Sequence, residues 1–213
     1  AVVPLKEGAT NTGVLYIDTK HTGNILTART DQLLKVFAAQ AGVAISRTRM
    51  FHHATSDPIT GIANQNLFLK RLTEEFCRAQ RHQKDISLIL MDIDHFSALN
   101  ETHGANNGDR ILKEVGRIFK NAMRINDLVA RIGPDSFAML LPETPFSGAQ
   151  IVAGKLRSTL NSTRIRAGSR SIQISGSFGI ASSSKNTGKP GDLLKVAEKA
   201  LKQAQKRGGN QVA

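Results

Sequence analysis

The spacing of hydrophobic residues alternates between the two-residue period of strands and the three- to four-residue period of helices, which indicates a mixed α/β protein. Residues 1–5 and 13–18 are strand-like runs separated by turn-forming residues, so they predict a β-hairpin. Over residues 31–53 apolar side chains recur at helical spacing without a proline, which predicts one long amphipathic helix. Neither element can bury its apolar face alone. We therefore expect the first ~50 residues to be the end of a sensor or interaction domain, or else an N-terminal extension packed on the rest of the chain.

The hydrophobic pattern restarts after residues 56–58 and predicts a second, larger unit. Helices are predicted over about residues 64–80 and 107–123, from beyond Pro145 to about 160, and over about 191–207. Strands are predicted over residues 86–92, 128–132, 137–141, 162–167 and 172–181. Only four residues join the second and third of these strands, so they form a predicted hairpin. A central hairpin combined with crossover helices predicts an α/β sandwich around a largely antiparallel sheet.

The composition is that of a folded globular protein. The chain has 213 residues, of which 40% are hydrophobic and 22% charged. Its longest apolar stretches, such as residues 88–91 and 137–141, are far shorter than the ~20 residues of a transmembrane helix, so no membrane-spanning segment is expected. Cys77 is the only cysteine, which excludes an intrachain disulfide and favours a cytoplasmic location. The N-terminus lacks Met and a signal-peptide pattern, and we expect the chain to be a fragment.

The net charge of +12 favours an anionic partner, such as a nucleotide, a nucleic acid or an acidic membrane, although a solvated basic surface also accounts for it. The chain has no Trp and a single Tyr, which leaves little for stacking with bases. No nucleic-acid polymer is therefore expected as a partner. No Cys/His cluster of zinc-binding type occurs either.

Acidic residues follow two of the predicted strands. The strand over residues 86–92 ends at Asp92, Asp94 follows two positions later, and Asp135 lies at the tip of the central hairpin. Carboxylates at neighbouring strand ends predict a Mg²⁺ site for phosphoryl transfer. Asp is also common in turns after strands, and the spacing alone favours this second interpretation. Asn100 and Asp109 flank a Gly-rich loop that is equally consistent with a turn followed by a helix cap.

Residues 57–210 carry ordered motifs that resemble a GGDEF domain. The motifs are Asp-Pro-Ile-Thr-Gly-Ile-Ala-Asn at 57–64, Met-Asp-Ile-Asp-His-Phe at 91–96, and Asp-Leu-Val-Ala-Arg-Ile-Gly-Pro-Asp-Ser-Phe at 127–137. GGDEF domains are diguanylate cyclases, which join two GTP molecules into cyclic di-GMP, or degenerate relatives that bind nucleotides and signal. Residues 2–5, 13–18 and the Ala-rich helix resemble the end of a GAF sensor domain. The resemblance implies a GAF remnant over residues 1–30, a signalling helix over 31–55 and a degenerate GGDEF domain over 56–213.

The resemblance also assigns roles to individual residues. It implies that Asp92, Asp135 and the carbonyl of Ile93 are the metal ligands, with Mg²⁺ present only together with GTP, and that Asn100 and Asp109 contact guanine. The signature itself is Gly133-Pro134-Asp135-Ser136-Phe137, so a proline replaces a glycine and a serine replaces a carboxylate. The family's phosphate-binding cations are replaced by Ser97, Gln205 and Gly209.

Arg124 and Asp127 form an Arg-x-x-Asp pair at the distance from the signature where the family binds its product. The resemblance implies that both bind cyclic di-GMP, with support from Lys155, whereas a plain ion pair at a helix end is the simpler interpretation. These features predict a catalytically impaired cyclic di-GMP receptor, which dimerises through the helix over residues 31–53. The alternatives are a weak or partner-dependent diguanylate cyclase, and an interaction module that binds no nucleotide.

Overall fold

The computed structural model describes residues 2–7, 10–18, 28–167, 170–183 and 188–213. The chain divides into two compact units, Ala1–Ala54 and Thr55–Ala213. Residues 19–27 of the predicted GAF remnant lie outside the described residues.

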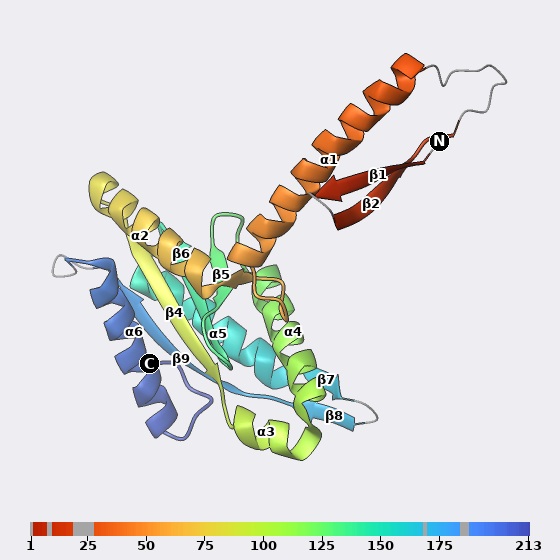
Figure 1. Cartoon of the computed structure of the whole chain (residues 1–213). Helices are drawn as coiled ribbons and strands as arrows, with labels where there is room; N and C mark the ends of the chain where they lie inside the picture. Colours follow the sequence, from red (N-terminus) through yellow and green to blue (C-terminus); the bar gives the residue numbers. More distant parts are fainter. Residues whose placement is uncertain (1, 8–9, 19–27, 168–169, 184–187) are drawn as a thin grey trace. The chain divides into compact units, whose positions relative to one another are not determined.

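The first unit consists of a hairpin and one long helix (Figure 1). Strands β1 (Val2–Glu7) and β2 (Thr10–Tyr16) pair in antiparallel orientation, which confirms the predicted hairpin. Helix α1 (Ala28–Thr55) buries Ala38 against Val3 and Leu5 of β1. A side chain at Gly42 would meet the backbone of Lys6, so glycine at this position allows the helix to approach the strand closely.

A second set of apolar residues on α1 remains exposed. Its large members include Val36, Phe37, Val43 and Met50, each more than half exposed. The predicted apolar stripe thus divides between two faces, because Leu34 and Ala41 pack near the hairpin while Phe37 is exposed.

The second unit is built on a five-stranded sheet of order β3-β5-β6-β4-β9. Its strands are β3 (Ala63–Asn64), β4 (Ile86–Ile93), β5 (Leu128–Arg131), β6 (Ser136–Pro142) and β9 (Gly176–Ser182). All pairs are antiparallel except β3 with β5, which confirms the predicted α/β fold. Successive residues of β4 point to opposite faces of the sheet, and both faces are covered, so its apolar run is continuous.

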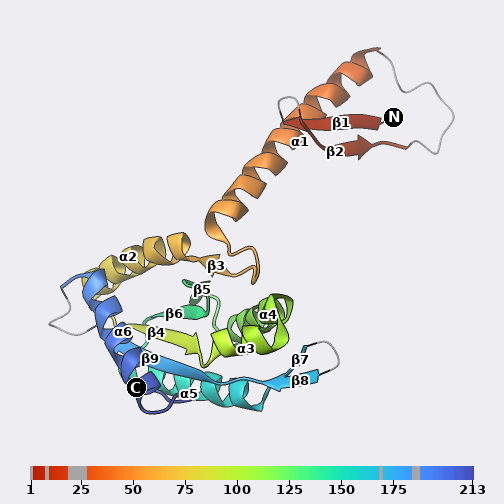
Figure 2. The same ribbon diagram turned by 60° about the horizontal axis from the view of Figure 1, so that its bottom comes forward.

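Helices cover the two faces of this sheet (Figure 2). On one face, α2 (Gln65–His82) and α6 (Pro190–Lys206) share a core with Leu88 and Leu90. On the other, α4 (Ala105–Ala122) and α5 (Phe146–Ser162) share a core with Ile89 and Met91. The sheet therefore places the end of β4, with its acidic residues, between two rigid layers.

Two sequence predictions for this unit were wrong in detail. The loop before residue 107 contains a further helix, α3 (Phe96–His103), which starts after His95 in a left-handed conformation and ends at Gly104. The predicted strand over residues 172–181 is divided into β8 (Arg170–Gln173), which pairs with β7 (Arg164–Ala167), and β9. The division falls at Ser175, whose carbonyl accepts a hydrogen bond from the amide of Asp94 over 3.0 Å.

Candidate functional site

The acidic end of β4 lies beside the hairpin signature. Asp92 is paired with Ser136 of β6 and with Ser177 of β9 in the sheet register. The amide of Ile93 donates to the carbonyl of Asp135 over 3.2 Å, which holds Asp135 next to β4. Asp92, Ile93 and Asp135 line a cavity of about 520 Å³.

The carboxylate of Asp92 is surrounded by neutral donors and negative charges. Its Oδ2 accepts a hydrogen bond from Nε2 of Gln205 over 2.8 Å, and it shares a side-chain hydrogen bond with Ser136. Burial and the charges of Asp135 and Asp94 raise the pKa of Asp92, and these effects outweigh the two hydrogen bonds, which lower it. The other oxygen, Oδ1, is buried without a hydrogen-bond partner in the described part of the chain.

These residues fit a hard cation in part. Carboxylate and carbonyl oxygens are the ligands that Mg²⁺ prefers, and the unpartnered Oδ1 of Asp92 is available for one bond. Within the described residues, no group of three or more His, Cys, Asp or Glu side chains is placed to hold a metal ion. A bound Mg²⁺ would therefore take its remaining ligands from water or from phosphate oxygens.

Asp94 has a structural role instead. Its carboxylate accepts hydrogen bonds from the hydroxyls of Ser175 and Ser177, each over 2.7 Å, and from the amide of Asn210 over 2.8 Å. Gly209 has a positive φ of 74°, and a Cβ there would lie 3.0 Å from this carboxylate. The backbone of this turn therefore favours glycine at position 209, where the positive φ and the nearby carboxylate leave little room for a side chain.

The predicted guanine contacts lie on the neighbouring helices. Asn100 belongs to α3, and its Oδ1 is buried without a hydrogen-bond partner among the described residues. Its side chain occupies the space above Gly108 of α4, where any Cβ would clash with it. Asp109 is the next residue of α4 and is exposed. Neither residue is among those that line the Asp92 cavity, so their guanine contacts remain a prediction.

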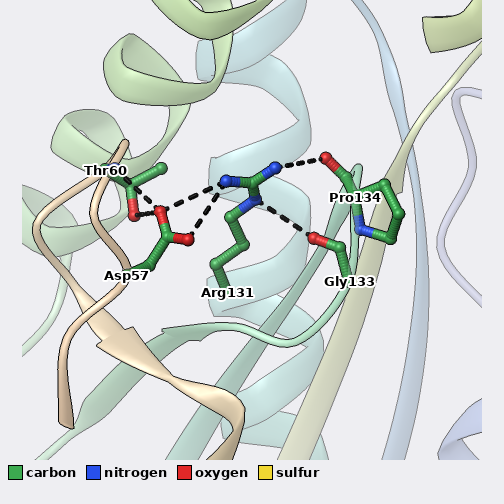
Figure 3. Close-up of polar contacts among 5 residues, drawn as sticks. All are labelled: Asp57, Thr60, Arg131, Gly133 and Pro134. Carbon is green, nitrogen blue, oxygen red and sulfur yellow. Dashed lines mark hydrogen bonds and ion pairs between the residues drawn. The ribbon is translucent and has the colours of Figure 1, made fainter. Parts of the chain in front are cut away.

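A side-chain network that the sequence analysis missed fixes the signature turn (Figure 3). Arg131 donates from Nε to the carbonyl of Gly133 over 3.1 Å and from Nη2 to that of Pro134 over 2.8 Å. Its Nη1 contacts both carboxylate oxygens of Asp57, at 3.3 and 3.1 Å. The signature turn is therefore held to the segment that comes after α1 in the sequence. Two features of the sequence could have indicated this network, namely Asp57 in a turn-forming motif and Arg131 just before the signature.

The network is well shielded from solvent. The side chains of Arg131 and Asp57 are only 12% and 15% exposed. Burial raises the pKa of Asp57, but hydrogen bonds from Thr60 and the charge of Arg131 outweigh this and lower it below its ordinary value. The backbone amide and the hydroxyl of Thr60 donate to Oδ1 at 2.8 and 2.7 Å.

Arg124 and Asp127 line a separate cavity of about 360 Å³. They lie in the turn between α4 and β5, where Oδ2 of Asp127 accepts a hydrogen bond from the backbone amide of Arg124 over 2.9 Å. The structure describes no ion pair between their side chains, so the simple ion-pair interpretation was wrong. Asp127 shapes the turn through the backbone, and the exposed guanidinium of Arg124 has no ion-pair partner among the described residues.

Helix α2 adds positive charge to this cavity. Arg71, Arg78 and His82 line it, and the buried carboxylate of Glu75 holds the two arginines at 3.0 and 3.3 Å. Lys155, on α5, is not among the described residues that line the cavity, so its support for ligand binding remains a prediction.

Comparison with known proteins identifies the family. Residues 54–211 match the family described as "Diguanylate cyclase, GGDEF domain". The chain belongs to this family, and its second unit is a GGDEF domain.

Among curated proteins, the chain is 27% identical over 214 residues to diguanylate cyclase A of Treponema denticola, and 34% identical over 168 residues to diguanylate cyclase DgcS of Shewanella oneidensis. The matches cover 99% and 78% of this chain but only 58% and 55% of those proteins. The chain thus spans about half the length of these relatives.

Solved structures agree in fold. The coiled coil and GGDEF domain of Caulobacter crescentus DgcB, in complex with c-di-GMP, matches with a TM-score of 0.80 and 24% identity, covering 88% of this chain and 99% of that one. Diguanylate cyclase SiaD of Pseudomonas aeruginosa, in complex with its activator SiaC, matches with a TM-score of 0.72 and 27% identity, covering 87% of this chain and 71% of that one.

Among the described residues, every helix is too short or too polar to cross a membrane.

Proposed function

We propose that the GGDEF unit is a cyclic di-GMP receptor that binds its ligand at the Arg124 cavity and has impaired cyclase activity. The observation that carries this proposal is the exposed guanidinium of Arg124, which lies with Asp127 and the arginines of α2 around one cavity. An Arg side chain can bind a guanine edge through two parallel hydrogen bonds.

The other residues of the cavity suit the rest of such a ligand. Oδ1 of Asp127 has capacity to accept from the N–H groups of a second guanine while Oδ2 stays on the backbone amide of Arg124. Cyclic di-GMP carries two phosphodiester charges, and Arg71, Arg78 and His82 place cationic or protonatable groups nearby. This set needs neither Mg²⁺ nor a triphosphate.

The degenerate signature supports the second half of the proposal. Ser136 cannot supply the negative charge of the carboxylate it replaces, and Gln205 cannot supply the positive charge of a lysine. Pro134 has a fixed φ and no amide hydrogen, which hinders close approach of a nucleotide to the turn. Each change removes electrostatic stabilisation or geometry from the same site.

The first unit completes the proposed arrangement. The hairpin is the remnant of a GAF sensor domain, α1 is the signalling helix, and the exposed side chains of Val36, Phe37, Val43 and Met50 pair with a second copy in a homodimer. The protein acts in the cytoplasm, where cyclic di-GMP is made and sensed.

A weak or partner-dependent diguanylate cyclase is the second candidate. Asp92, Asp135 and Asn100 are retained, and unpartnered oxygens of Asp92 and Asn100 would suit Mg²⁺ and guanine. SiaD, one of the structural relatives, is a cyclase with an activator. In this second candidate Mg²⁺ binds together with GTP. A nucleotide-independent interaction module is the third candidate.

Calorimetric titration of the whole chain with cyclic di-GMP, and separately with GTP and Mg²⁺, separates the three candidates. The receptor binds cyclic di-GMP without metal, and GTP weakly or not at all. Tight GTP binding with formation of product supports the cyclase. Absence of binding by either ligand supports the interaction module.

A further inference from the structure

A groove between α4 and β7 gathers positive charge that neither candidate site uses. The cavity has a volume of about 560 Å³, and its buried lining residues are Ile62, Gly116 and Ile165. Figures 1 and 2 both show β7 beside α4, and the two elements are in contact. The groove is also lined by six basic residues, Arg110, Lys113, Arg117 and Lys120 of α4 and Arg164 and Arg166 of β7.

The spacing of these residues places the positive charges in rows along α4 and β7. On α4 the cations recur at intervals of three and four residues, which keeps them on one face of the helix. The stretch from Arg110 to Lys120 extends about 15 Å along the helix axis at 1.5 Å per residue. Arg164 and Arg166 are two positions apart on a strand, so both point to the same side.

Negative charge in the groove is nearly absent among the described residues. Glu114 is the one acidic residue of the described lining, and Nε of Arg117 donates to it over 3.0 Å. The other five basic residues have no ion-pair partner in the described part of the chain. Their repulsion is therefore uncompensated, which favours an anionic ligand.

We propose that this groove binds a linear phosphate chain, with inorganic polyphosphate as its best-fitting source. Four of the six cations are arginines. The three that are not paired with Glu114 have planar guanidinium groups that can make paired hydrogen bonds with phosphate oxygens. A single phosphate cannot reach cations spread over about 15 Å, whereas a chain of phosphates can contact all of them.

Other sources of negative charge fit less well. The described lining holds no aromatic side chain, so nucleic-acid bases have nothing on which to stack. A second copy of this chain has the same net charge of +12, so its surface offers little negative charge to this groove. An acidic polypeptide has carboxylates on separate flexible side chains, each of which must be ordered on binding.

Competition binding with the whole chain tests the proposal. The probe is fluorescently labelled inorganic polyphosphate long enough to span the α4 line, and the competitors are unlabelled polyphosphate, oligouridylate and polyglutamate of equal charge. We expect polyphosphate to compete best. Equal competition by oligouridylate or polyglutamate, or no probe binding at low salt, would overturn the proposal.

A charge-matched pair of variants locates the site. K113E/K120E changes two exposed groove residues, whereas K195E/K199E makes the same charge change on exposed positions of α6. K113E/K120E should weaken binding about tenfold or more and reduce the salt dependence by about one unit of slope per lost contact. K195E/K199E should have little effect at physiological salt, because the Debye length is about 8 Å. Equal losses in both variants would show binding by bulk charge alone and overturn the proposal.

Two controls keep this result interpretable. Circular dichroism must show that both variants are folded, and charge reversal at exposed positions makes this the expected outcome. Titration with cyclic di-GMP must be unchanged in K113E/K120E, because the groove does not include Arg124 or Asp127. A negative result for polyphosphate binding at the groove is thus independent of a negative result for cyclic di-GMP binding at Arg124.

Discussion

Nε2 of Gln205 donates a hydrogen bond to Oδ2 of Asp92 over 2.8 Å, and Ser136 shares a hydrogen bond with the same carboxylate. Gln205 and Ser136 therefore meet on one carboxylate, and both stand at positions where the proposed function places a degenerate site. Under that proposal, Gln205 takes the place of a cation and Ser136 takes the place of a carboxylate. The two replacements would leave the local net charge unchanged and give Asp92 two neutral hydrogen-bond partners.

Restoring the signature is expected to raise cyclase activity. The triple variant P134G/S136E/Q205K introduces a glycine in the turn, a carboxylate and a cation. Loss of one such electrostatic contact typically lowers an enzymatic rate by about 10²–10³. We therefore expect the variant to be faster than the unmodified chain by at least this factor. Chromatography of reactions with GTP and Mg²⁺ measures the product. The unmodified chain should stay far below about one turnover per second. The same triple variant with D92N is the control and should be inactive.

Asp92 is expected to lower the stability of the metal-free protein at neutral pH. Since burial and neighbouring acids raise its pKa, the folded state holds an ionised group that it favours in protonated form. D92N should therefore raise the free energy of unfolding at neutral pH by about 1 kcal/mol and unfold at a higher temperature. This gain in stability should shrink as the pH falls through the raised pKa of Asp92, because the unmodified chain then becomes protonated. D94N is the control and should destabilise, because it disturbs three hydrogen bonds. A stability of D92N below that of the unmodified chain at pH 7 would contradict the expectation.

The regular elements were predictable because their signals are local. The continuous apolar run of β4 and the helical period of α4 are visible in the sequence itself. The division between β8 and β9 was not, because it depends on Asp94, far away along the chain. Helix α3 was missed because it is short and its boundary residue, Gly104, is typical of a loop.

The candidate site was predictable only through its resemblance to a family. Spacing alone favoured turn-forming aspartates over a metal site. The contact between Asp57 and Arg131, which are 74 positions apart, and the hydrogen bond between Gln205 and Asp92 arise from tertiary packing that no local pattern encodes.

Breaking the Asp57–Arg131 pair is expected to destabilise the GGDEF unit. D57N keeps an oxygen for Thr60 but leaves the shielded guanidinium without its charge partner, at a cost of about 1.5–3 kcal/mol at neutral pH. The pKa of Asp57 is lowered below 3.8, so its contribution is present above that value and is lost as the pH falls through the folded-state pKa. Urea unfolding at several pH values measures this. E74Q, which affects an exposed pair with Lys70, is the control and should cost at most about 0.5 kcal/mol.

Self-association is expected to depend on the exposed face of α1. V43E places a charge among Val36, Phe37 and Met50 and should shift a dimer toward monomer, because a buried unpaired charge is costly in an apolar interface. Light scattering at tens of micromolar measures the mass. V196E makes the same substitution at an exposed position of α6 and is the matched control. A full-length protein that is monomeric before any substitution would contradict the homodimer.

Cyclic di-GMP binding is expected to require both members of the Arg-x-x-Asp pair. R124A removes a bidentate guanine contact worth roughly 1–3 kcal/mol, so calorimetry should show affinity weaker by about 5- to 150-fold. D127N is the sharper test, because the amide oxygen of Asn can still accept from the backbone amide of residue 124 and keep the turn. It loses only the second acceptor oxygen that would face a guanine, so it should weaken binding while leaving thermal stability nearly unchanged. K195A removes one exposed cation on α6 and controls for charge. Binding that is insensitive to both R124A and D127N, or absent in the unmodified chain at hundreds of micromolar, would exclude the receptor and favour the interaction module.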